Sequence, residues 1–336
     1  MENAEIQQAI DKLPRLSFNE LPTPLHHCPR LSGKLRGPNI YIKRDDLTGL
    51  AFGGNKSRYL EFTLAEAVEQ GADAVVLSAV VHSNHCRQLA AAAAKIGLKA
   101  VVVLRQHDES PMGYREHPTG NYLLDQLFGA DVLIAAPSQL PAVIAEEMER
   151  LKREGYQPFT GLSGLRSRVA YIQCALELDK QFDELGIDPQ YIYIGSSGNS
   201  LAGLVAGFNL LCQPRHLVGV TRGKVGPPQE AAARLAESAR GAAEFIGFAC
   251  TPAPDHILLD DRYTGPGFGI LDPPTRDAIH LLARTEAILL DPAYTGKGFV
   301  GFLDHIRQGR FSPDEAVVFV HTGGTPLTFL YGEDLL

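Results

Sequence analysis

The sequence lacks the features of membrane proteins and of secreted proteins that disulfides stabilise. No apolar run is long enough to cross a bilayer, and the N-terminal residues lack the basic and apolar segments of a signal peptide. The five cysteines are odd in number and far apart, so they indicate neither a disulfide framework nor a CxxC metal pair. We therefore expect a cytoplasmic protein.

The composition also gives little support for nucleic acid or metal as a partner. The net charge is −8 and the basic residues are dispersed, which argues against binding to nucleic acid or to an anionic membrane surface. None of the eleven histidines stands at metal-ligand spacing, and the adjacent His26 and His27 cannot both face one ion from regular structure. We expect no metal site.

The sequence does contain a repeated alternation of apolar strand-like runs and amphipathic helical runs. The strand-like runs are residues 39–43, 74–77, 100–104, 132–134, 191–194, 216–220 and 316–320, and the helical runs are residues 84–96, 140–154, 202–211 and 274–290. Continuous apolar strands separated by helices are typical of parallel sheets covered on both faces, which predicts an α/β fold. With 336 residues and 45% hydrophobic composition, we expect two lobes.

Ligands of open parallel sheets bind at the carboxyl ends of the strands, where Ser83, Gly195 and Thr322 fall by this interpretation. The charged stretch from residue 105 to residue 120 is broken by proline and glycine, and it is predicted to be a surface loop.

One lysine stands at a position that is typical of a reactive amine. Lys56 follows a Gly53-Gly54-Asn55 turn, after the strand-like run 39–43 and before a helical pattern. A lysine at such a junction can form a Schiff base with an aldehyde cofactor or a carbonyl substrate. Glycines before a lysine are also ordinary turn chemistry, so the spacing alone leaves both interpretations open.

A segment rich in glycine and serine joins the apolar strand 191–194 to the following helical run. Successive backbone N–H groups and the positive end of the helix dipole make such a segment a favourable phosphate site. The segment lacks the Lys-Ser/Thr ending of a nucleotide P-loop, which disfavours a nucleoside triphosphate. Its residues are Gly195, Ser196, Ser197, Gly198, Asn199 and Ser200.

Together with Ser83-Asn84-His85 and His321-Thr322-Gly323-Gly324, these segments make the chain resemble the pyridoxal-phosphate enzymes of fold type II. The resemblance is to the branch that holds D-cysteine desulfhydrase and 1-aminocyclopropane-1-carboxylate deaminase. It runs from residue 23 to residue 331, with matching segments in family order. These segments are Ile42-Lys43-Arg44-Asp45-Asp46, Gly53-Gly54-Asn55-Lys56, His82-Ser83-Asn84-His85, Leu290-Asp291-Pro292-Ala293-Tyr294-Thr295-Gly296-Lys297 and His321-Thr322-Gly323-Gly324.

The resemblance implies two open, twisted, mostly parallel sheets flanked by helices. A large domain would comprise residues 1–54 and 167–336, and a small domain residues 55–166, with pyridoxal 5'-phosphate in the cleft between them. Relatives are commonly homodimers, so the resemblance also implies a homodimer. The substrate would be a small amino acid.

The resemblance further implies a role for each candidate site residue. Lys56 would bind the cofactor aldehyde and then take the substrate α-proton. Asn84 would contact the ring hydroxyl oxygen, Thr322 the pyridine nitrogen, and residues 195–200 the phosphate. Ser83 would bind the substrate carboxylate, in addition to capping a helix. Ser83 and Tyr294 would also take part in catalysis, and the substrate pocket would include His82, Ser83, Asn84, His85, Phe268 and Tyr294.

Two threonines favour β-elimination over ring opening. Deaminases of the family usually carry an acid directly after the motif tyrosine and an apolar residue after the final histidine, whereas this chain has Thr295 and Thr322. A hydroxyl leaves the pyridine nitrogen closer to neutral than a carboxylate does, which suits elimination of a good leaving group. We therefore expect a lyase that converts a D-cysteine-like amino acid to pyruvate, ammonia and sulfide.

Departures from the family pattern leave other substrates open. Residues 79–82 read Ala-Val-Val-His where Gly-Gly-x-Gln is common, and Phe268 stands where many relatives have tyrosine. His82 could bind an anionic leaving group such as a sulfonate, or act as an acid. The alternatives are 1-aminocyclopropane-1-carboxylate deaminase, a lyase for L-cysteate or another sulfur amino acid, and a non-catalytic relative that binds an amino acid.

Overall fold

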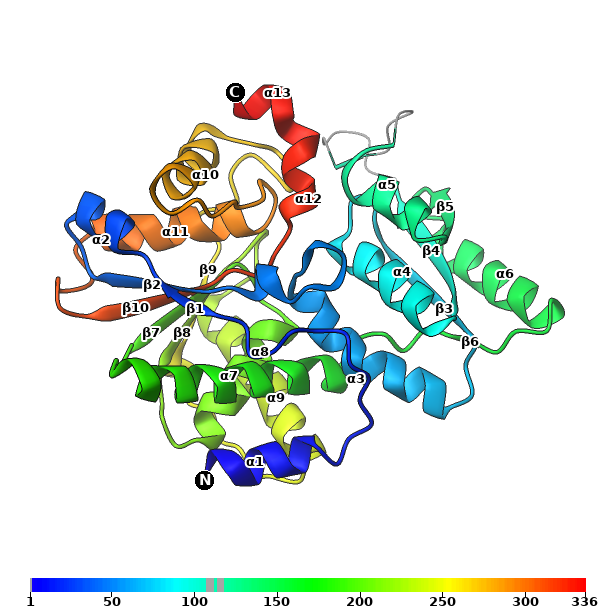
Figure 1. Ribbon diagram of the computed structural model, residues 1–336, viewed down its shortest axis with the longest axis horizontal. Helices are drawn as coiled ribbons and strands as arrows, with labels where there is room; N and C mark the ends of the chain where they lie inside the picture. The colour runs from blue at the N-terminus through cyan, green and yellow to red at the C-terminus, as the bar shows by residue number, and fades with distance from the viewer. Residues whose placement is uncertain (1, 107–111, 114–117) are drawn as a thin grey trace.

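The structure is a computed structural model that describes residues 2–106, 112–113 and 118–336 (Figure 1). It contains two separate sheets, one of six strands and one of four, each flanked by helices. The predicted α/β class with two mostly parallel sheets is confirmed. Most of the predicted surface loop between residues 105 and 120 lies outside the described residues.

The six-stranded sheet takes its strands from both ends of the chain. Its order is β1-β2-β10-β7-β8-β9, with β1 antiparallel to β2 and the other described neighbours parallel. The strands are β1 (Leu25–His27), β2 (Asn39–Lys43), β7 (Tyr191–Ile194), β8 (His216–Val220), β9 (Ile257–Asp260) and β10 (Ala316–Val320). The apolar runs at 39–43, 191–194, 216–220 and 316–320 therefore form strands with the predicted bounds.

Helices cover both faces of this sheet, which explains why its central strands are apolar throughout. Successive side chains of a strand point to opposite faces. In β10, Val318 and Val320 pack with helices of one face, and Val317 and Phe319 pack with helices of the other. The first face carries α1 (Asn3–Ile10), α7 (Leu165–Leu185), α8 (Asn199–Leu210) and α9 (Pro228–Phe245); the second carries α2 (Pro29–Leu35), α10 (Pro273–Glu286) and α11 (Thr295–Arg307) (Figure 1).

The four-stranded sheet is parallel and takes its strands from the middle of the chain. Its order is β5-β4-β3-β6, and it lies on the right in Figure 1. The strands are β3 (Ala74–Val80), β4 (Lys99–Arg105), β5 (Asp131–Ala135) and β6 (Pro158–Phe159), and the accompanying helices are α4 (Asn84–Ile96), α5 (Gly120–Leu127) and α6 (Leu140–Arg153). Helix α3 (Asn55–Glu69) packs against both α4 and α7, so it joins the two sheets.

Some helix boundaries differ from the predicted ones. Helix α8 begins at Asn199, three residues before the predicted start, because the first turn is built from Asn199 and Ser200, which are not apolar. Helix α10 ends at Glu286, where Ala287 adopts a left-handed conformation. Short helices α12 (Thr325–Thr328) and α13 (Gly332–Leu335) close the chain. The proposed domain boundaries at 54/55 and 166/167 stay a prediction.

Within the described residues, no helix is both long and apolar enough to cross a membrane. The same residues contain no group of three or more His, Cys, Asp or Glu side chains placed to hold a metal ion.

Candidate active site

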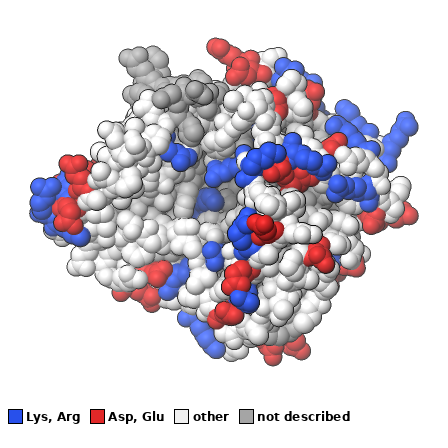
Figure 2. Space-filling view, turned by 180° about the vertical axis from the view of Figure 1, so that it is seen from behind, with Lys and Arg blue, Asp and Glu red and all other residues white. Residues whose placement is uncertain are grey.

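A cavity of about 490 Å³ is lined by residues from both sheets and their helices. Figure 2, which looks at the back of the molecule, shows a hollow near the middle of this face with Lys and Arg side chains around it. The lining consists of Asn55, Lys56, Tyr59, Ser78, Ala79, Val80, Ser83, Asn84, His85, Arg105, Leu140, Gly195, Ser196, Ser197, Gly198, Asn199, Arg222, Tyr294, Thr322 and Gly323. Most of these residues follow the carboxyl end of a strand, as the ligand rule for parallel sheets predicts.

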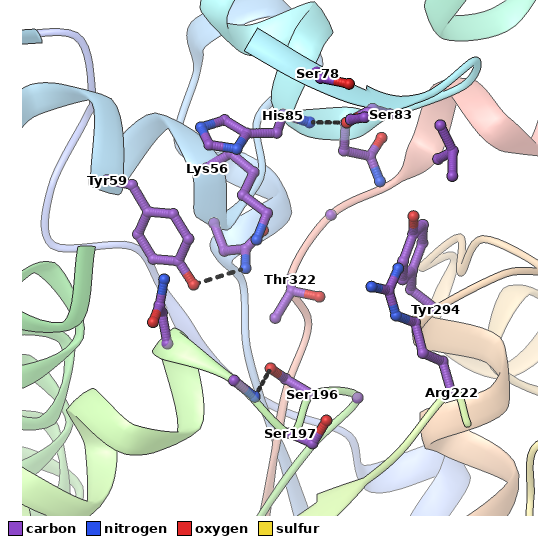
Figure 3. A pocket seen from close by; sticks show the side chains of 18 of the residues that line it. Lys56, Tyr59, Ser78, Ser83, His85, Ser196, Ser197, Arg222, Tyr294 and Thr322 are labelled. Atoms are coloured by element: carbon purple, nitrogen blue, oxygen red, sulfur yellow. Dashed lines mark hydrogen bonds between the residues drawn. The ribbon is translucent and has the colours of Figure 1, made fainter. Parts of the chain in front are cut away.

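Lys56 is the second residue of α3 and its side chain extends into the cavity (Figure 3). Its Nζ lies 4.6 Å from the centroid of the Tyr59 ring. Burial, with a smaller contribution from the positive charge of Arg222, lowers the pKa of Lys56 to about 8. The site therefore favours the neutral, nucleophilic amine more than water does.

The glycine turn before Lys56 allows a close approach to the end of β10. Gly54 has a φ of 127°, and a Cβ atom there would lie 2.5 Å from Gln88 Nε2 and 3.2 Å from the Thr322 carbonyl oxygen. The backbone N–H of Asn55 donates to that same carbonyl at 3.0 Å. Only glycine permits this contact, which places Lys56 and Thr322 on the same cavity.

The predicted phosphate segment lies at the floor of the cavity in Figure 3. Gly195, Ser196, Ser197, Gly198 and Asn199 line the cavity just before and at the start of α8. The Ser196 hydroxyl accepts a hydrogen bond from Gly198 N at 3.2 Å. A Cβ atom at Gly198 would meet nothing within 4 Å, so there is open space on that side of the residue.

Ser200 differs from the expectation that its hydroxyl binds the phosphate. The residue is fully buried and is not part of the cavity lining. Its hydroxyl accepts from Asn55 Nδ2 at 2.9 Å and is hydrogen-bonded to Tyr59. Because Ser200 lies inside the first turn of α8 and not in the loop, its side chain points into the interface with α3.

Ser83, Asn84 and His85 enter the cavity at the start of α4. The Ser83 hydroxyl caps the helix by accepting from His85 N at 3.1 Å and Cys86 N at 3.3 Å. Asn84 Oδ1 accepts from Asn121 Nδ2 at 2.8 Å, which leaves Asn84 Nδ2 as a donor for a ligand. Burial next to Lys56 lowers the pKa of His85 to about 3, so its ring is neutral.

Tyr294 lies across the cavity from Lys56, and Thr322 lies between the two in this view (Figure 3). The Asp291 carboxylate holds the loop that carries Tyr294 by accepting from the backbone N–H groups of Ala293, Tyr294 and Thr295 at 2.7–2.9 Å. Burial raises the pKa of the Tyr294 phenol to about 12, so the phenol keeps its proton at neutral pH.

Two residues expected in the substrate pocket, His82 and Phe268, lie outside the cavity lining, and so does Thr295. The Thr295 hydroxyl donates to Asp291 at 2.6 Å, so it serves the Tyr294 loop and lies outside the cavity lining. His82 is buried, with its ring near Gly120, and it is also absent from the lining. Phe268 packs edge-on against Tyr294, with ring centroids 5.4 Å apart, and it is absent from the lining.

Sequence reasoning missed several lining residues, above all Arg105 and Arg222. Arg105 is the last residue of β4, and Arg222 comes two residues after β8. The rule that ligands gather at strand carboxyl ends could have identified both arginines, because both strands were predicted. Tyr59, one turn after Lys56 on α3, could have been found by its helical spacing.

The lining residues fit pyridoxal 5'-phosphate. The site offers one lysine of lowered pKa, a glycine- and serine-rich loop that lines the cavity at a helix N-terminus, an amide donor on Asn84 and the hydroxyl of Thr322. The buried Nε2 of His85 has no partner among the described residues, as expected for a group that faces a ligand.

Comparisons with known proteins agree with this fit. The family model for pyridoxal-phosphate dependent enzymes matches residues 16–323. D-cysteine desulfhydrase of Klebsiella pneumoniae subsp. pneumoniae is 39% identical over 333 residues, covering 96% of this chain and 98% of the relative. The Salmonella typhimurium D-cysteine desulfhydrase is 38% identical over 330 residues, which cover 96% of this chain and 97% of the relative.

Among solved structures, an ACC deaminase homologue matches with a TM-score of 0.86 and 35% identity, covering 100% of this chain and 99% of the other. Threonine deaminase isoform 2 from Solanum lycopersicum shares the fold, with a TM-score of 0.65 at 16% identity over 99% of this chain and 90% of the other. The family match over most of the chain and the curated relatives lead to one conclusion: this chain belongs to the family of pyridoxal-phosphate-dependent enzymes.

Proposed function

We propose that the chain is a lyase that catalyses α,β-elimination from a β-substituted amino acid of the D-cysteine type. One substrate molecule and one water molecule would yield pyruvate, ammonia and the released β-substituent, which is sulfide in the case of cysteine. The main support is the position of Lys56, which shares one cavity with Ser83, Asn84 and Tyr294. The likeness to D-cysteine desulfhydrases over nearly the full chain supports the same reaction.

Lys56 has two tasks in this reaction. Its amine, with a pKa of about 8, would hold the cofactor covalently and, after the substrate amine replaces it, accept the α-proton at Nζ. When bound, the cofactor supplies the electron sink that stabilises negative charge at the α-carbon.

Residues around Lys56 would orient the substrate and protonate the leaving group. Ser83 and the N-terminal backbone of α4 would bind the α-carboxylate, since a helix N-terminus favours an anion. The Tyr294 phenol, whose pKa is about 12, holds a proton that it could donate to the departing sulfur. Thr322 would offer its hydroxyl to the pyridine nitrogen.

Ring opening of 1-aminocyclopropane-1-carboxylate is the second candidate reaction. It is favoured by the likeness to the solved ACC deaminase homologue. The Thr322 hydroxyl favours elimination instead, because it stabilises a positively charged pyridine ring less than a carboxylate would. Thr295 gives no support to either reaction, because its hydroxyl donates a hydrogen bond to Asp291 and does not line the cavity.

An assay of pyruvate and ammonia from the cofactor-loaded protein tests the proposal. The panel would contain D-cysteine, L-cysteine, L-cysteate, both enantiomers of β-chloroalanine and 1-aminocyclopropane-1-carboxylate, with the keto acid identified. We expect pyruvate from a β-substituted alanine and loss of that activity in Lys56→Ala. Formation of 2-oxobutyrate from the cyclopropane alone would contradict elimination. No keto acid from any substrate would favour the non-catalytic relative that binds an amino acid.

We also propose that the protein acts in the cytoplasm as a homodimer. The exposed apolar side chains of Leu47, Phe52 and Leu289 line one groove of about 1020 Å³, which supports a covered surface there. Light scattering of the purified protein would give its mass in solution. A mass of one chain would contradict the dimer.

A further inference from the structure

The cavity contains more positive charge than the proposed reaction uses. Lys56, Arg105 and Arg222 line it, and the described lining residues include no aspartate or glutamate. The cofactor phosphate would be held by backbone N–H groups of residues 195–199 and the substrate α-carboxylate by Ser83. Both arginines are therefore left without an anionic partner in that assignment.

Arg222 is placed to contact the part of a substrate that lies next to Tyr294. Its guanidinium carbon lies 5.6 Å from the centroid of the Tyr294 ring and 5.2 Å from that of Phe268. Figure 3 shows it beside Tyr294, on the side of the cavity opposite Lys56 and His85. A guanidinium stacked on aromatic rings keeps N–H donors at its edge for an oxyanion.

Arg105 approaches the cavity from the other sheet. It pairs in register with Val80 of β3, which also lines the cavity. Its Nε is buried and has no hydrogen-bond partner among the described residues. A buried donor without a partner costs free energy, which an anionic ligand nearby would offset.

We propose that Arg222 binds a second negatively charged group of the substrate, carried on the β-carbon, and that Arg105 adds to the positive potential there. This inference rests on the proposed elimination and adds a preference among its β-substituted substrates for amino acids whose leaving group is an oxyanion such as a sulfonate or a phosphate. In the sulfonate case the C–S bond breaks, sulfur leaves with the electron pair, and one water converts the remaining fragment to pyruvate and ammonium with release of hydrogensulfite.

A binding experiment on the cofactor-loaded protein tests this charge preference without turnover. Aspartate and asparagine have the same shape, but only aspartate carries the second charge, and neither has a β-leaving group. Titration of each enantiomer, followed by the change in cofactor absorbance, gives two dissociation constants. We expect aspartate to bind about tenfold more tightly, and Arg222→Gln to remove the difference.

The matched control is Arg153→Gln, which removes the same charge from an exposed position at the end of α6. The control should keep the ratio of the two dissociation constants. Equal affinity for aspartate and asparagine in the unsubstituted protein would overturn the proposal. An equal loss of affinity for both ligands in Arg222→Gln would also overturn it, since Arg222 would then bind the α-carboxylate.

A turnover experiment separates this proposal from the proposed function. The ratio of kcat/KM for cysteate to that for β-chloroalanine should fall about tenfold in Arg222→Gln. If β-chloroalanine gives pyruvate but the ratio does not change, elimination stands and the charge preference fails. If no β-substituted alanine gives pyruvate while aspartate still binds preferentially, the proposed function fails and the anion preference stands.

Discussion

At the scale of single residues, the environment of Lys56 bears directly on its proposed bond to the cofactor. The side chain is surrounded by Tyr59, His85 and the nearby charge of Arg222, and it has no acidic neighbour among the described lining residues. Burial and positive charge both favour the neutral form of an amine. The lysine is thereby prepared for nucleophilic attack before any ligand binds.

Cofactor capture by the cofactor-free protein should therefore become faster as the pH rises, with a midpoint near pH 8 and a plateau above it. The neutral amine is the reactive species, and its fraction rises until the pH passes the Lys56 pKa of about 8. Stopped-flow absorbance at a series of pH values measures the rate. Arg222→Gln should shift the midpoint upward, because the charge of Arg222 lowers that pKa. A rate that still increases near pH 10 would show an ordinary lysine.

A second prediction at this scale concerns Asn121, which lies outside the cavity lining. Its Nδ2 donates to Asn84 Oδ1 and to the His82 carbonyl oxygen, both at 2.8 Å, and its Oδ1 accepts from Arg87. Asn121 therefore fixes the orientation of the Asn84 amide, whose Nδ2 we propose as the donor to the cofactor. It is a positioning residue.

Asn121→Ala should weaken cofactor binding about tenfold and shift the absorbance of the bound cofactor, because the Asn84 donor loses its fixed orientation. Asn121→Asp keeps an acceptor for Arg87 and removes the donor, so it should show the same spectral shift. The absorbance spectrum and a fluorescence titration provide the measurements. An unchanged spectrum in both variants would mean that Asn84 is oriented by other contacts.

At the scale of elements, the start of α4 combines stability and binding in one side chain. The Ser83 hydroxyl accepts two backbone N–H groups of the first turn, and the same residue lines the cavity. The sequence left open whether Ser83 is a helix cap or a ligand residue. In the structure the Ser83 hydroxyl caps α4, and its contact with the substrate carboxylate stays a prediction.

Two substitutions separate these roles. Ser83→Ala removes the cap and should lower the free energy of unfolding by about 1 kcal/mol. Ser83→Asp keeps a good cap at the positive end of the helix but places a second carboxylate where the substrate carboxylate would bind. It should unfold like the unsubstituted protein and lose kcat/KM. Denaturant titration and the keto-acid assay measure the two effects, and full activity of Ser83→Asp would contradict the carboxylate role.

At the scale of the whole molecule, the cavity depends on both sheets. Arg105, Ser83 and Asn84 come from the four-stranded sheet and its helices, whereas Gly195, Thr322 and Arg222 belong to the six-stranded sheet. A ligand that contacts both sets adds contacts between the two sheets. Its binding therefore stabilises the folded chain as a whole.

Cofactor loading should raise the unfolding temperature by several degrees. A ligand at 100 times its dissociation constant adds about 2.7 kcal/mol to the free energy of unfolding. Lys56→Ala, which cannot bond covalently, should show a clearly smaller rise at the same cofactor concentration. Thermal melts with and without pyridoxal 5'-phosphate make the comparison. An identical rise in both proteins would mean that Lys56 does not hold the cofactor.

The central strands and the class of the fold were predictable from the sequence, because these features depend on local patterns, whereas the covalent role of Lys56 stays a prediction. An apolar run such as 316–320 needs no knowledge of its neighbours to be identified as a buried strand, whereas the Gly53-Gly54-Asn55-Lys56 turn indicated a reactive lysine only beside the other matching segments. Helix α8 was predicted to start late, because its first turn is polar and only packing against α3 buries Ser200.

By itself the sequence determined the two-sheet α/β architecture and the segments that carry Lys56, Ser83, Gly195 and Thr322. Only the tertiary structure decided which side chains share the cavity. It turned Thr295 toward Asp291 and Ser200 toward Tyr59, and it brought Arg105 and Arg222 to the cavity from different sheets. The physical reason is that a side chain's partner is set by contacts between distant segments, and no pattern within one segment records those contacts.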